Sequence, residues 1–325
     1  MMQRPVHFFV DAIEWLLDSD PAIRWQAMRD LKDNSGEAIA YQRARISHEG
    51  MGAEILNLQQ VDGSWRRDHA SAWRITLFTM QLLRATGIDP ATPAVVTAIE
   101  RLESGVRWNN VEGSWDLRAP ETGGNTFFEG EVEPCINGGA LALGAYFGRP
   151  NESLAHRLVN EQLEDGGWNC EAPKSTRSSF HTTICVLEGL LEYRRAVGST
   201  PEVASSQKRG EEYLLKRALY SRFSSGEIAN PEFLKLAFPH RYHYDVLRAL
   251  DYFRGAVIEP DARVANAVGV VQRKVQADGR WLLDAKYDEG LVISFDELVN
   301  KPSRWNTLRA LRVLRWYEQS FPHGA

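Results

Sequence analysis

The sequence is poor in cysteine and has no long apolar run. Its 325 residues include three cysteines, Cys135, Cys170 and Cys185, an odd and sparse set that argues against a disulfide framework and for a reducing compartment. No apolar stretch is long enough to span a bilayer, and the first ten residues lack the pattern of a signal peptide. We therefore expect a cytoplasmic protein with no integral membrane segment.

The chain has slightly fewer basic than acidic residues. The chain has 38 Lys and Arg against 43 Asp and Glu, which gives a net charge of −5. Without a basic stripe or an arginine-rich tail, we expect no nucleic-acid partner and no polybasic membrane patch. The remaining composition, 43% hydrophobic and 25% charged, is that of a globular protein with a sizeable core. A homo-oligomer is compatible with it, although no residue pattern specifies one.

Strand-like alternation is scarce, and a repeated hexamer takes its place as the main signal. Its copies are residues 60–65 (Gln-Val-Asp-Gly-Ser-Trp), 110–115 (Asn-Val-Glu-Gly-Ser-Trp), 163–168 (Leu-Glu-Asp-Gly-Gly-Trp) and 276–281 (Gln-Ala-Asp-Gly-Arg-Trp). The last two copies are separated by about twice the spacing of the others, so we expect a degenerate copy between them, near residues 223–227. A fixed period of about 50 residues is typical of repeat architectures.

The hexamer combines a turn with a wedge. An acidic residue followed by Gly is a strong turn signal, because Gly adopts positive φ at little steric cost. The tryptophan that follows is expected to fill the seam between neighbouring units, with its indole N–H hydrogen-bonded. Four unrelated loops that contain Gly and Trp are the alternative, and the near-regular spacing disfavours it.

Helical periodicity fills the sequence between the hexamers. Apolar residues recur at spacings of three and four, as buried helices require, in residues 70–86, 135–147, 179–195, 242–254 and 305–317. More polar helices are predicted at residues 92–104, 153–162, 202–217 and 261–276. Ser19-Asp20-Pro21 is a helix start signal. The sequence thus predicts an all-α chain built from five to six helical hairpins.

The predicted hairpins form one closed array. The last apolar helix has no evident polar cap, which an open solenoid needs, so we predict an α/α toroid with apolar helices inside. Residues 51–325 would form this single toroid domain, and N-terminal helices within residues 1–50 would pack on it. Residues 116–134 and 282–303 are the longest loops and the expected lids of a central cavity.

The hexamers resemble the repeated Gln-Trp motifs of squalene–hopene and oxidosqualene cyclases. The whole pattern, from about residue 56 to residue 317, is similar to the α/α toroid of these cyclases and of protein prenyltransferase β-subunits. The resemblance implies a ring whose apolar cavity accepts an isoprenoid or a similar chain. The chain departs from these families, since it has no Asp-Asp pair and therefore neither the Asp-x-Asp-Asp nor the Asp-Asp-x-x-Asp motif.

Cysteine and histidine recur near the starts of the predicted inner helices. Protein prenyltransferases hold zinc with an Asp-x-Cys pair and a later His, and the resemblance places only His243 at a matching position. Cys135, Cys170, His181 and His243 would suit a tetrahedral zinc if the helix starts converge. The alternative is that the cysteines are small apolar fillers and the histidines are hydrogen-bonded structural residues.

Carboxylates and arginines near the same helix starts suggest two further roles. Glu131 and Glu133 precede Cys135, and Asp245 follows His243, so a desolvated carboxyl among them could act as a general acid. Arg177 and Arg241, with His240 and Arg304 nearby, could hold a diphosphate or a carboxylate. Solvated surface charge is the alternative for both groups.

Aromatic residues complete the candidate substrate site. They are Trp73, Phe180, Tyr242, Tyr244 and Trp305, whose ring faces could line an apolar cavity and stabilise cationic intermediates. The first hypothesis is therefore a cyclase-like lyase or isomerase, or a prenyl transferase, acting on an apolar substrate. A non-catalytic binding scaffold and zinc-thiol or polysaccharide chemistry on the same kind of ring are the alternatives.

Overall fold

The computed structural model of the chain describes residues 9–67, 72–108, 115–116 and 124–320. Within these residues, strands occur only as two-residue pieces: β1 (Arg107–Trp108), β2 (Trp115–Asp116) and β3 (Asn125–Thr126) form an antiparallel sheet in the order β2-β1-β3, and β4 (Trp281–Leu282) pairs with β5 (Pro302–Ser303). Everything else that is regular is helical, so the prediction of an all-α fold is confirmed.

Two sets of helices alternate along the chain. The predicted apolar helices are α5 (Ala72–Thr86), α7 (Pro134–Tyr146), α9 (Phe180–Val197), α11 (Val246–Gly255) and α13 (Arg304–Ser320). The outer helices that alternate with them are α4 (Gly50–Asn57), α6 (Pro93–Gly105), α8 (Glu152–Asn160), α10 (Pro201–Leu215) and α12 (Ala265–Arg273), with short 3₁₀ turns at Arg45–Ser47, Pro231–Leu234 and Ala262–Val264. The predicted helical hairpins are therefore present.

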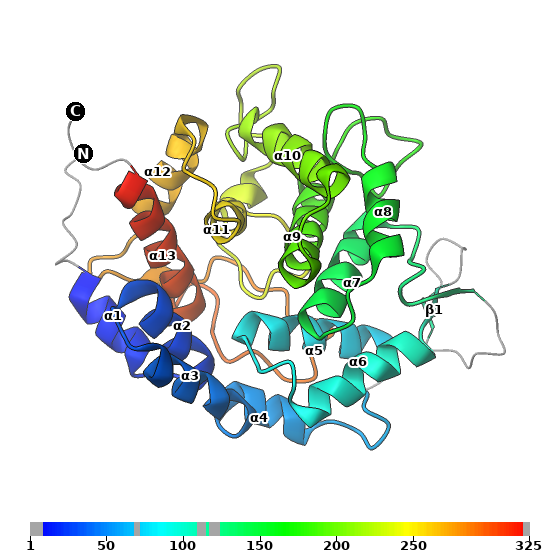
Figure 1. The fold of residues 1–325 in the computed structure, drawn as a ribbon. Helices are drawn as coiled ribbons and strands as arrows, with labels where there is room; N and C mark the ends of the chain where they lie inside the picture. The colour runs from blue at the N-terminus through cyan, green and yellow to red at the C-terminus, as the bar shows by residue number, and fades with distance from the viewer. Residues whose placement is uncertain (1–8, 68–71, 109–114, 117–123, 321–325) are drawn as a thin grey trace.

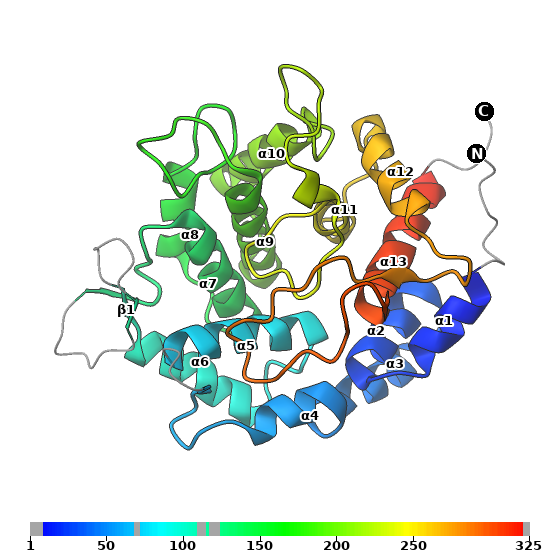
Figure 2. The ribbon, with the colours of Figure 1, turned by 180° about the vertical axis from the view of Figure 1, so that it is seen from behind.

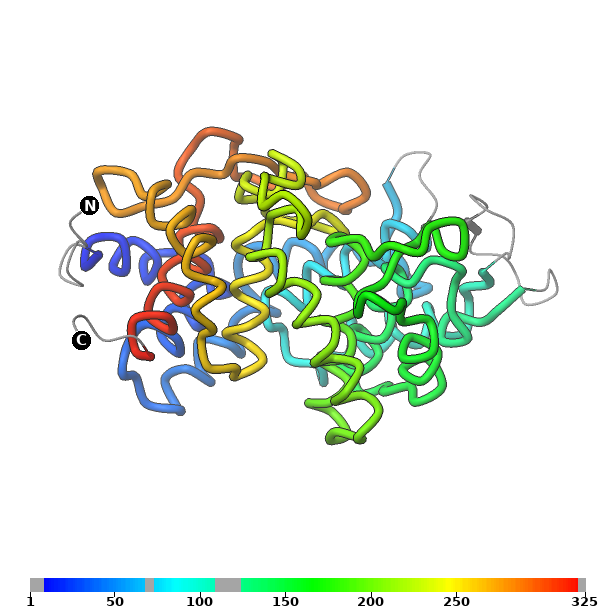
Figure 3. Tube along the Cα trace, turned by 90° about the horizontal axis from the view of Figure 1, so that it is seen from above, coloured from blue at the N-terminus to red at the C-terminus, as the bar shows by residue number. Residues whose placement is uncertain are grey.

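The helices follow one another around a ring (Figures 1 and 2). Helix α5 packs on α7, α7 on α9, and α11 on α13. The first helices of the chain, α1 (Val10–Leu17), α2 (Pro21–Leu31) and α3 (Gly36–Ala44), complete the circuit, since α13 packs on α1 and α2, α2 on α4, and α4 on α5. Figure 3 shows α1 and α13 side by side from another direction. We interpret this arrangement as the predicted toroid, and the boundary at residue 50 stays a prediction.

Three hexamer corners share one hydrogen-bonding pattern. The indole N–H groups of Trp65, Trp168 and Trp281 each donate to the carbonyl ten residues earlier, in the preceding outer helix, at 2.6–2.7 Å. Their backbone N–H groups each donate to a threonine hydroxyl in the following inner helix, at 3.0–3.1 Å. Because all three rings are fully buried, each tryptophan fastens an outer helix to an inner one. The turn glycines Gly63 and Gly166 have φ of +82° and +101°, as the motif requires.

The other two corners differ. Residues 110–114 of the second hexamer lie outside the described part of the chain, as does much of the predicted lid at 116–134. In the degenerate copy, Phe223 is 67% exposed and does not act as a wedge. The buried Tyr244, from the start of the next inner segment, instead donates its hydroxyl to the Leu219 carbonyl at 2.6 Å. At the fourth corner, the aromatic side chain therefore comes from the segment that follows the turn, and not from the turn itself.

Helix starts follow the capping residues. Asp20 accepts from the Ala22 N–H at 2.7 Å and so caps α2 with Pro21 at its first position, as predicted. The prediction that the fourth inner helix starts at Tyr242 is wrong, because Asp245 caps it through the Arg248 N–H at 2.9 Å and the helix begins at Val246. Tyr242 and Tyr244 therefore belong to the preceding loop. Among the described helices, none combines the length and the apolar character needed to cross a membrane.

Candidate functional site

A cavity of about 770 Å³ lies inside the ring. Helices α5, α7, α9, α11 and α13 all line it, and Gln26 adds α2 to the wall. Its wall at the amino ends of the inner helices includes Trp73, Cys135, His181 and Trp305. Its wall at their carboxyl ends includes Arg84, Glu192, Arg195, Arg254 and Arg312. The predicted convergence of the inner-helix starts is therefore present, and the two ends of the cavity carry different chemistry.

Aromatic side chains dominate the amino end. The Trp305 and Phe238 rings stack at 4.2 Å with an interplanar angle of 12°, and Trp73 packs edge-on against Trp108. Trp73, Phe78, Phe238, Tyr242 and Trp305 all line the cavity. Phe180 and Tyr244 are buried in a cluster with Phe233 and Tyr213 and lie outside the cavity wall. Three of the five predicted aromatic residues thus reach the cavity.

The segment between β4 and β5 covers this end. Figure 2 shows it crossing the face of the ring in front of α5. Tyr287 stacks on the His243 ring at 3.4 Å, Gly290 lies against the Phe78 ring, and the Leu291 carbonyl accepts from Arg67 at 3.1 Å. Leu291 itself lines the cavity. The second predicted lid therefore lies over the cavity, held by these contacts and by backbone hydrogen bonds between residues 284–287 and residues 236–239.

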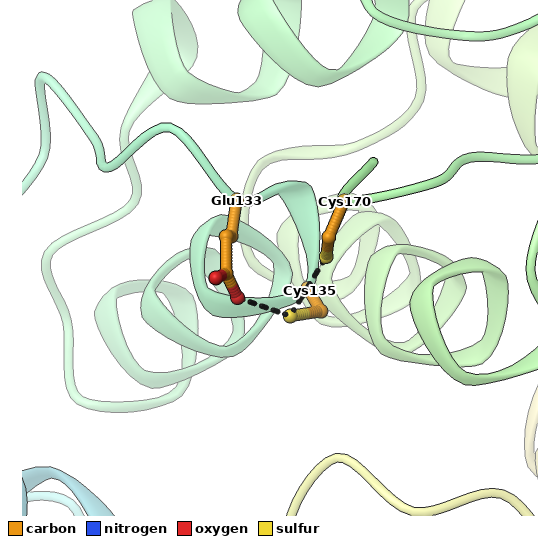
Figure 4. Close-up of side chains that lie close together, drawn as sticks. All are labelled: Glu133, Cys135 and Cys170. Atoms are coloured by element: carbon orange, nitrogen blue, oxygen red, sulfur yellow. Dashed lines mark hydrogen bonds between the residues drawn. The ribbon is translucent and has the colours of Figure 1, made fainter. Parts of the chain in front are cut away.

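Glu133, Cys135 and Cys170 form a compact cluster in the cavity wall (Figure 4). The two sulfur atoms share a hydrogen bond at 3.1 Å, the Cys135 thiol donates to Glu133 Oε2 at 3.5 Å, and Thr182 Oγ1 lies 3.3 Å from Cys170 Sγ. The shared hydrogen bond and burial raise the pKa of Cys135, and the same bond lowers the pKa of Cys170. One ligand atom from each of the three residues lies within 4.8 Å of the others, so the cluster can hold a metal ion.

The two histidines lie beside this cluster and are not part of it. His181 Nδ1 accepts from the Tyr244 N–H at 2.9 Å, and burial together with His243 lowers the pKa of His181 to about 4. His243 is sandwiched between Tyr242, at 4.1 Å, and Tyr287, and burial lowers its pKa as well. The structure thus divides the predicted set of zinc ligands: it brings Cys135 and Cys170 together and adds Glu133, but leaves out both imidazoles.

Of the predicted acids, only Glu133 lines the cavity. Glu131 is buried beside it, where its carboxylate accepts from the Glu133 N–H at 2.5 Å and burial raises its pKa. Asp245 is fully buried at the start of α11, accepts from the Ala237 and Arg248 N–H groups, and has its pKa raised by burial. Both carboxylates accept hydrogen bonds from backbone N–H groups and lie outside the cavity wall, so neither is placed to reach a molecule in the cavity.

Of the predicted basic residues, Arg241 and His240 line the cavity. The Arg241 guanidinium lies 4.1 Å above the Phe78 ring, which Arg74 approaches from 5.8 Å. Its Nε is buried without a hydrogen-bond partner. Arg241 forms an ion pair at 3.4 Å with Glu289, a side chain that is 70% exposed. Arg177 is exposed and away from the cavity, and Arg304 donates to the Asp18 carbonyl.

Sequence reasoning missed the buried charges in the middle of the cavity. Arg248 forms a bidentate pair with Glu188 at 2.7 and 2.8 Å and also donates to the His243 carbonyl. Burial alone would raise the pKa of Glu188, but Arg248 outweighs it and the pKa is lowered. Charged residues inside the apolar stretches of α9 and α11 were the signal for this pair, because such positions otherwise face the core.

The wall carries an excess of positive charge. Among the described residues, eight arginines and five carboxylates line the cavity, although the whole chain has a net charge of −5. The arginines are Arg74, Arg84, Arg195, Arg241, Arg248, Arg254, Arg309 and Arg312, and the acids are Glu133, Glu171, Glu188, Glu192 and Asp251. Such a low-dielectric concave wall attracts anions.

Comparisons with known proteins give weak likenesses. No protein-family model and no curated protein matches the chain. A protein from Actinoplanes is similar in structure at 14% identity and a TM-score of 0.49, over 96% of this chain and 98% of that one. Type II terpene cyclase MstE from Scytonema, in complex with geranylgeranyl dihydroxybenzoate, is similar at 16% identity and a TM-score of 0.47, over 95% of each chain. Both TM-scores lie below 0.5, so neither likeness establishes what this chain does.

Proposed function

We propose that this chain binds and acts on an amphiphilic small molecule, an isoprenoid or a similar apolar chain with an anionic head group, inside the ring. The observation that carries the proposal is the cavity, which combines aromatic and aliphatic walls with unbalanced positive charge. Its volume of about 770 Å³ lies in the range of sites for small organic ligands.

The apolar chain would lie along α5 and α7. Trp73, Leu77 and Phe78 project from α5, and Ile136 and Gly139 from α7. Gly139 keeps this part of the wall open, since a Cβ there would lie 2.6 Å from the Gln81 amide nitrogen and would displace that side chain. Burying such a chain is favourable by about 25 cal/mol per Å² of apolar surface.

The anionic head group would lie at the amino end, between Arg74 and Arg241. Two guanidinium groups beside one phenyl ring repel each other, and the Arg241 pKa is lowered by burial and by Arg74. A buried cation with an unpartnered Nε gains a charge-assisted hydrogen bond when an anion arrives. Phosphate, diphosphate and carboxylate groups all have the required chemistry.

The geometry disfavours one reaction route for this substrate. Protonation of an alkene needs a neutral carboxylic acid that faces the chain. Glu131 and Asp245, whose pKa values are raised, do not line the cavity, whereas the cavity-lining Glu188 and Asp251 are ion-paired and have lowered pKa values. Among the other groups that face the cavity, Glu133 and the thiols of Cys135 and Cys170 lie together, with one ligand atom of each within 4.8 Å of the others, so we place chemistry on the substrate at this cluster.

Zinc is a second candidate feature of this cluster. Two thiols and a carboxylate are suitable donors, and zinc would polarise a bound oxygen or activate a thiol there. Tetrahedral zinc with Zn–S bonds of about 2.3 Å needs sulfur atoms about 3.8 Å apart, whereas Cys135 and Cys170 are 3.1 Å apart. The donor types fit zinc, but the present distance between the two sulfur atoms is too short for it. Metal analysis of the purified protein and of Cys170→Ser tests it: zinc in the parent and none in the variant supports the site.

Calorimetric titration tests the main proposal. Geranylgeraniol, geranylgeranoic acid and geranylgeranyl diphosphate share one chain and differ in head group. We expect the two anions to bind at least about 10-fold more tightly than the alcohol, and Gly139→Leu to weaken all three by about 10-fold or more because it fills the cavity.

The matched controls use residues outside the cavity. Gly36→Leu adds the same side chain at an exposed glycine with no atom within 4 Å of a new Cβ, and Arg177→Gln removes an exposed arginine away from the cavity. Both variants should bind as the parent does. If no probe binds, or if Gly139→Leu binds as tightly as Gly36→Leu, the proposal is wrong. Product analysis of the same mixtures separates an enzyme from a non-catalytic scaffold.

A further inference from the structure

We infer that Cys135 and Cys170 form a redox-active pair that exchanges with a low-molecular-weight disulfide entering the cavity and closes into an intramolecular disulfide. The observation that carries this inference is direct contact between two thiols on separate structural elements, both exposed to one cavity. The third cysteine, Cys185 on α9, also borders the cavity, but it is only 6% exposed and its thiol donates to the Tyr242 carbonyl at 3.7 Å, so it serves as an internal control.

The fold holds the two thiols together. Cys135 is the second residue of α7, directly after Pro134. Cys170 follows the corner that Trp168 fastens through its indole and backbone N–H groups. Their sulfur atoms need to approach by about 1 Å to reach the S–S bond length of about 2.05 Å.

Close packing of α7 on α9 fixes the distance between these elements. A Cβ on Gly138 would lie 2.4 Å from the Cys185 carbonyl oxygen, and one on Gly189 would lie 2.5 Å from the Gly138 carbonyl oxygen. Only glycine permits this approach. This contact holds α7 against α9, and Cys170, in the loop before α9, is tied to the start of α9 by the 3.3 Å contact of its Sγ with Thr182 Oγ1.

The reaction is a two-step exchange. The Cys170 thiolate attacks one sulfur of a disulfide RSSR, which forms Cys170–S–S–R and releases RS⁻. Cys135 then gives its proton to Glu133, the nearest carboxylate at 3.5 Å, and its thiolate attacks Cys170 Sγ, which expels the second RS⁻. Each RS⁻ takes up one of the two protons lost by the cysteines. Two cysteine thiols are oxidised and one RSSR is reduced to two RSH.

Thiol trapping in glutathione buffers tests the pair. Reduced protein is equilibrated with glutathione and glutathione disulfide at a series of ratios, quenched with acid, alkylated and weighed intact. We expect the number of alkylated cysteines to fall from three to one as the buffer becomes oxidising, and peptide mapping to find Cys135 linked to Cys170. Cys185→Ser should keep the transition, whereas Cys135→Ser and Cys170→Ser should stop at a mixed disulfide with glutathione.

Three outcomes would overturn the inference. Alkylation of all three cysteines at every ratio would show that the pair does not close. A linkage that includes Cys185 would show that the wrong thiols react. One zinc per chain that stays bound and protects both thiols in oxidising buffer would show that the cluster is a metal site. All three are read on the parent protein, so they do not depend on whether a variant folds.

Discussion

The two ends of the cavity are built from different kinds of interaction. At the carboxyl ends of the inner helices, buried charges are paired: Asp251 contacts Arg312 and Arg254, and Arg312 also reaches Asp30 of α2. At the amino ends, Cys135, Cys170 and Arg241 make sparse contacts within an aromatic wall. The ion pairs around Asp251 stabilise closure of the ring between α11, α13 and α2, whereas sparser pairing at the amino ends leaves groups available to a ligand.

The largest expected effect is at the paired end. Asp251→Asn would leave Arg312, Arg254 and Arg309 without their shared carboxylate in a buried setting, which should lower the free energy of unfolding by about 3–5 kcal/mol. Urea denaturation at pH 7 measures it. The control is Asp33→Asn, since Asp33 is fully exposed and pairs with Arg315 at 3.7 Å, and its effect should stay below about 0.5 kcal/mol. Equal effects of the two variants would remove the contrast between buried and exposed pairs.

The second largest effect is a loss of stability in acid, which we expect from His181 at the aromatic end of the cavity. His181 has a folded pKa of about 4, below the value near 6.5 of an unfolded chain. The unfolded state therefore binds more protons between these values, and stability falls as the pH falls from about 6.5 to 4, by on the order of 2–3 kcal/mol. His243 and Arg248 face the ring and act in the same direction.

A variant isolates the contribution of His181 to this loss. In His181→Asn the amide oxygen can accept from the Tyr244 N–H as Nδ1 does, but it does not titrate. Urea midpoints measured at pH 7, 5.5 and 4.5 should fall less steeply for the variant than for the parent. Parallel pH profiles would show that His181 is not the source.

A smaller effect is expected at a hexamer corner. Thr183→Val removes the hydroxyl that accepts from the buried Trp168 N–H at 3.1 Å and keeps nearly the same volume. An unsatisfied buried N–H costs about 1–3 kcal/mol, and chemical denaturation should show this loss. Thr176→Val, at an exposed position, is the matched control. No difference between them would mean that the threonine does not fasten the corner.

The smallest effect on stability is expected for Arg241→Gln. The Arg241 side chain is desolvated, its residue has φ of +48°, and its ion pair is with an exposed carboxylate, so its removal should change the free energy of unfolding by less than about 1 kcal/mol. The same variant should lose at least about 10-fold in affinity for geranylgeranyl diphosphate. A large loss of stability without a loss of binding would reverse the assignment of this end as the functional one.

Local signals made the fold predictable. Three of the four hexamers become the same corner, since the acidic residue, the glycine and the tryptophan each have a local physical role. Helix positions followed from periodicity and capping, but two helices begin four residues later than predicted: α11 begins at Val246, after the Asp245 cap, and α12 begins at Ala265, after a 3₁₀ turn. The fourth corner could not be foreseen, because Tyr244 replaces the tryptophan from a different place in the chain.

The candidate site was predictable only in part. The sequence identified Cys135, Cys170, Glu133, Arg241, Trp73, Tyr242 and Trp305, all of which line the cavity. It also placed Glu131, Asp245, Phe180 and Tyr244 there, and burial directs these four side chains into the protein instead. A position at a helix start determines at which end of the cavity a residue lies, whereas the direction of its side chain depends on how its neighbours pack.

The sequence by itself determined the helical repeat, its turns and the apolar faces that bring helices together, because these depend on residues within a few positions of one another. Tertiary structure alone decided which polar groups meet. Three features depend on distances between different helical hairpins: the 3.1 Å contact between Cys135 and Cys170, the Arg248–Glu188 pair and the buried, unpartnered Nε of Arg241. Those distances follow from close packing around the whole ring, a property that no single segment contains.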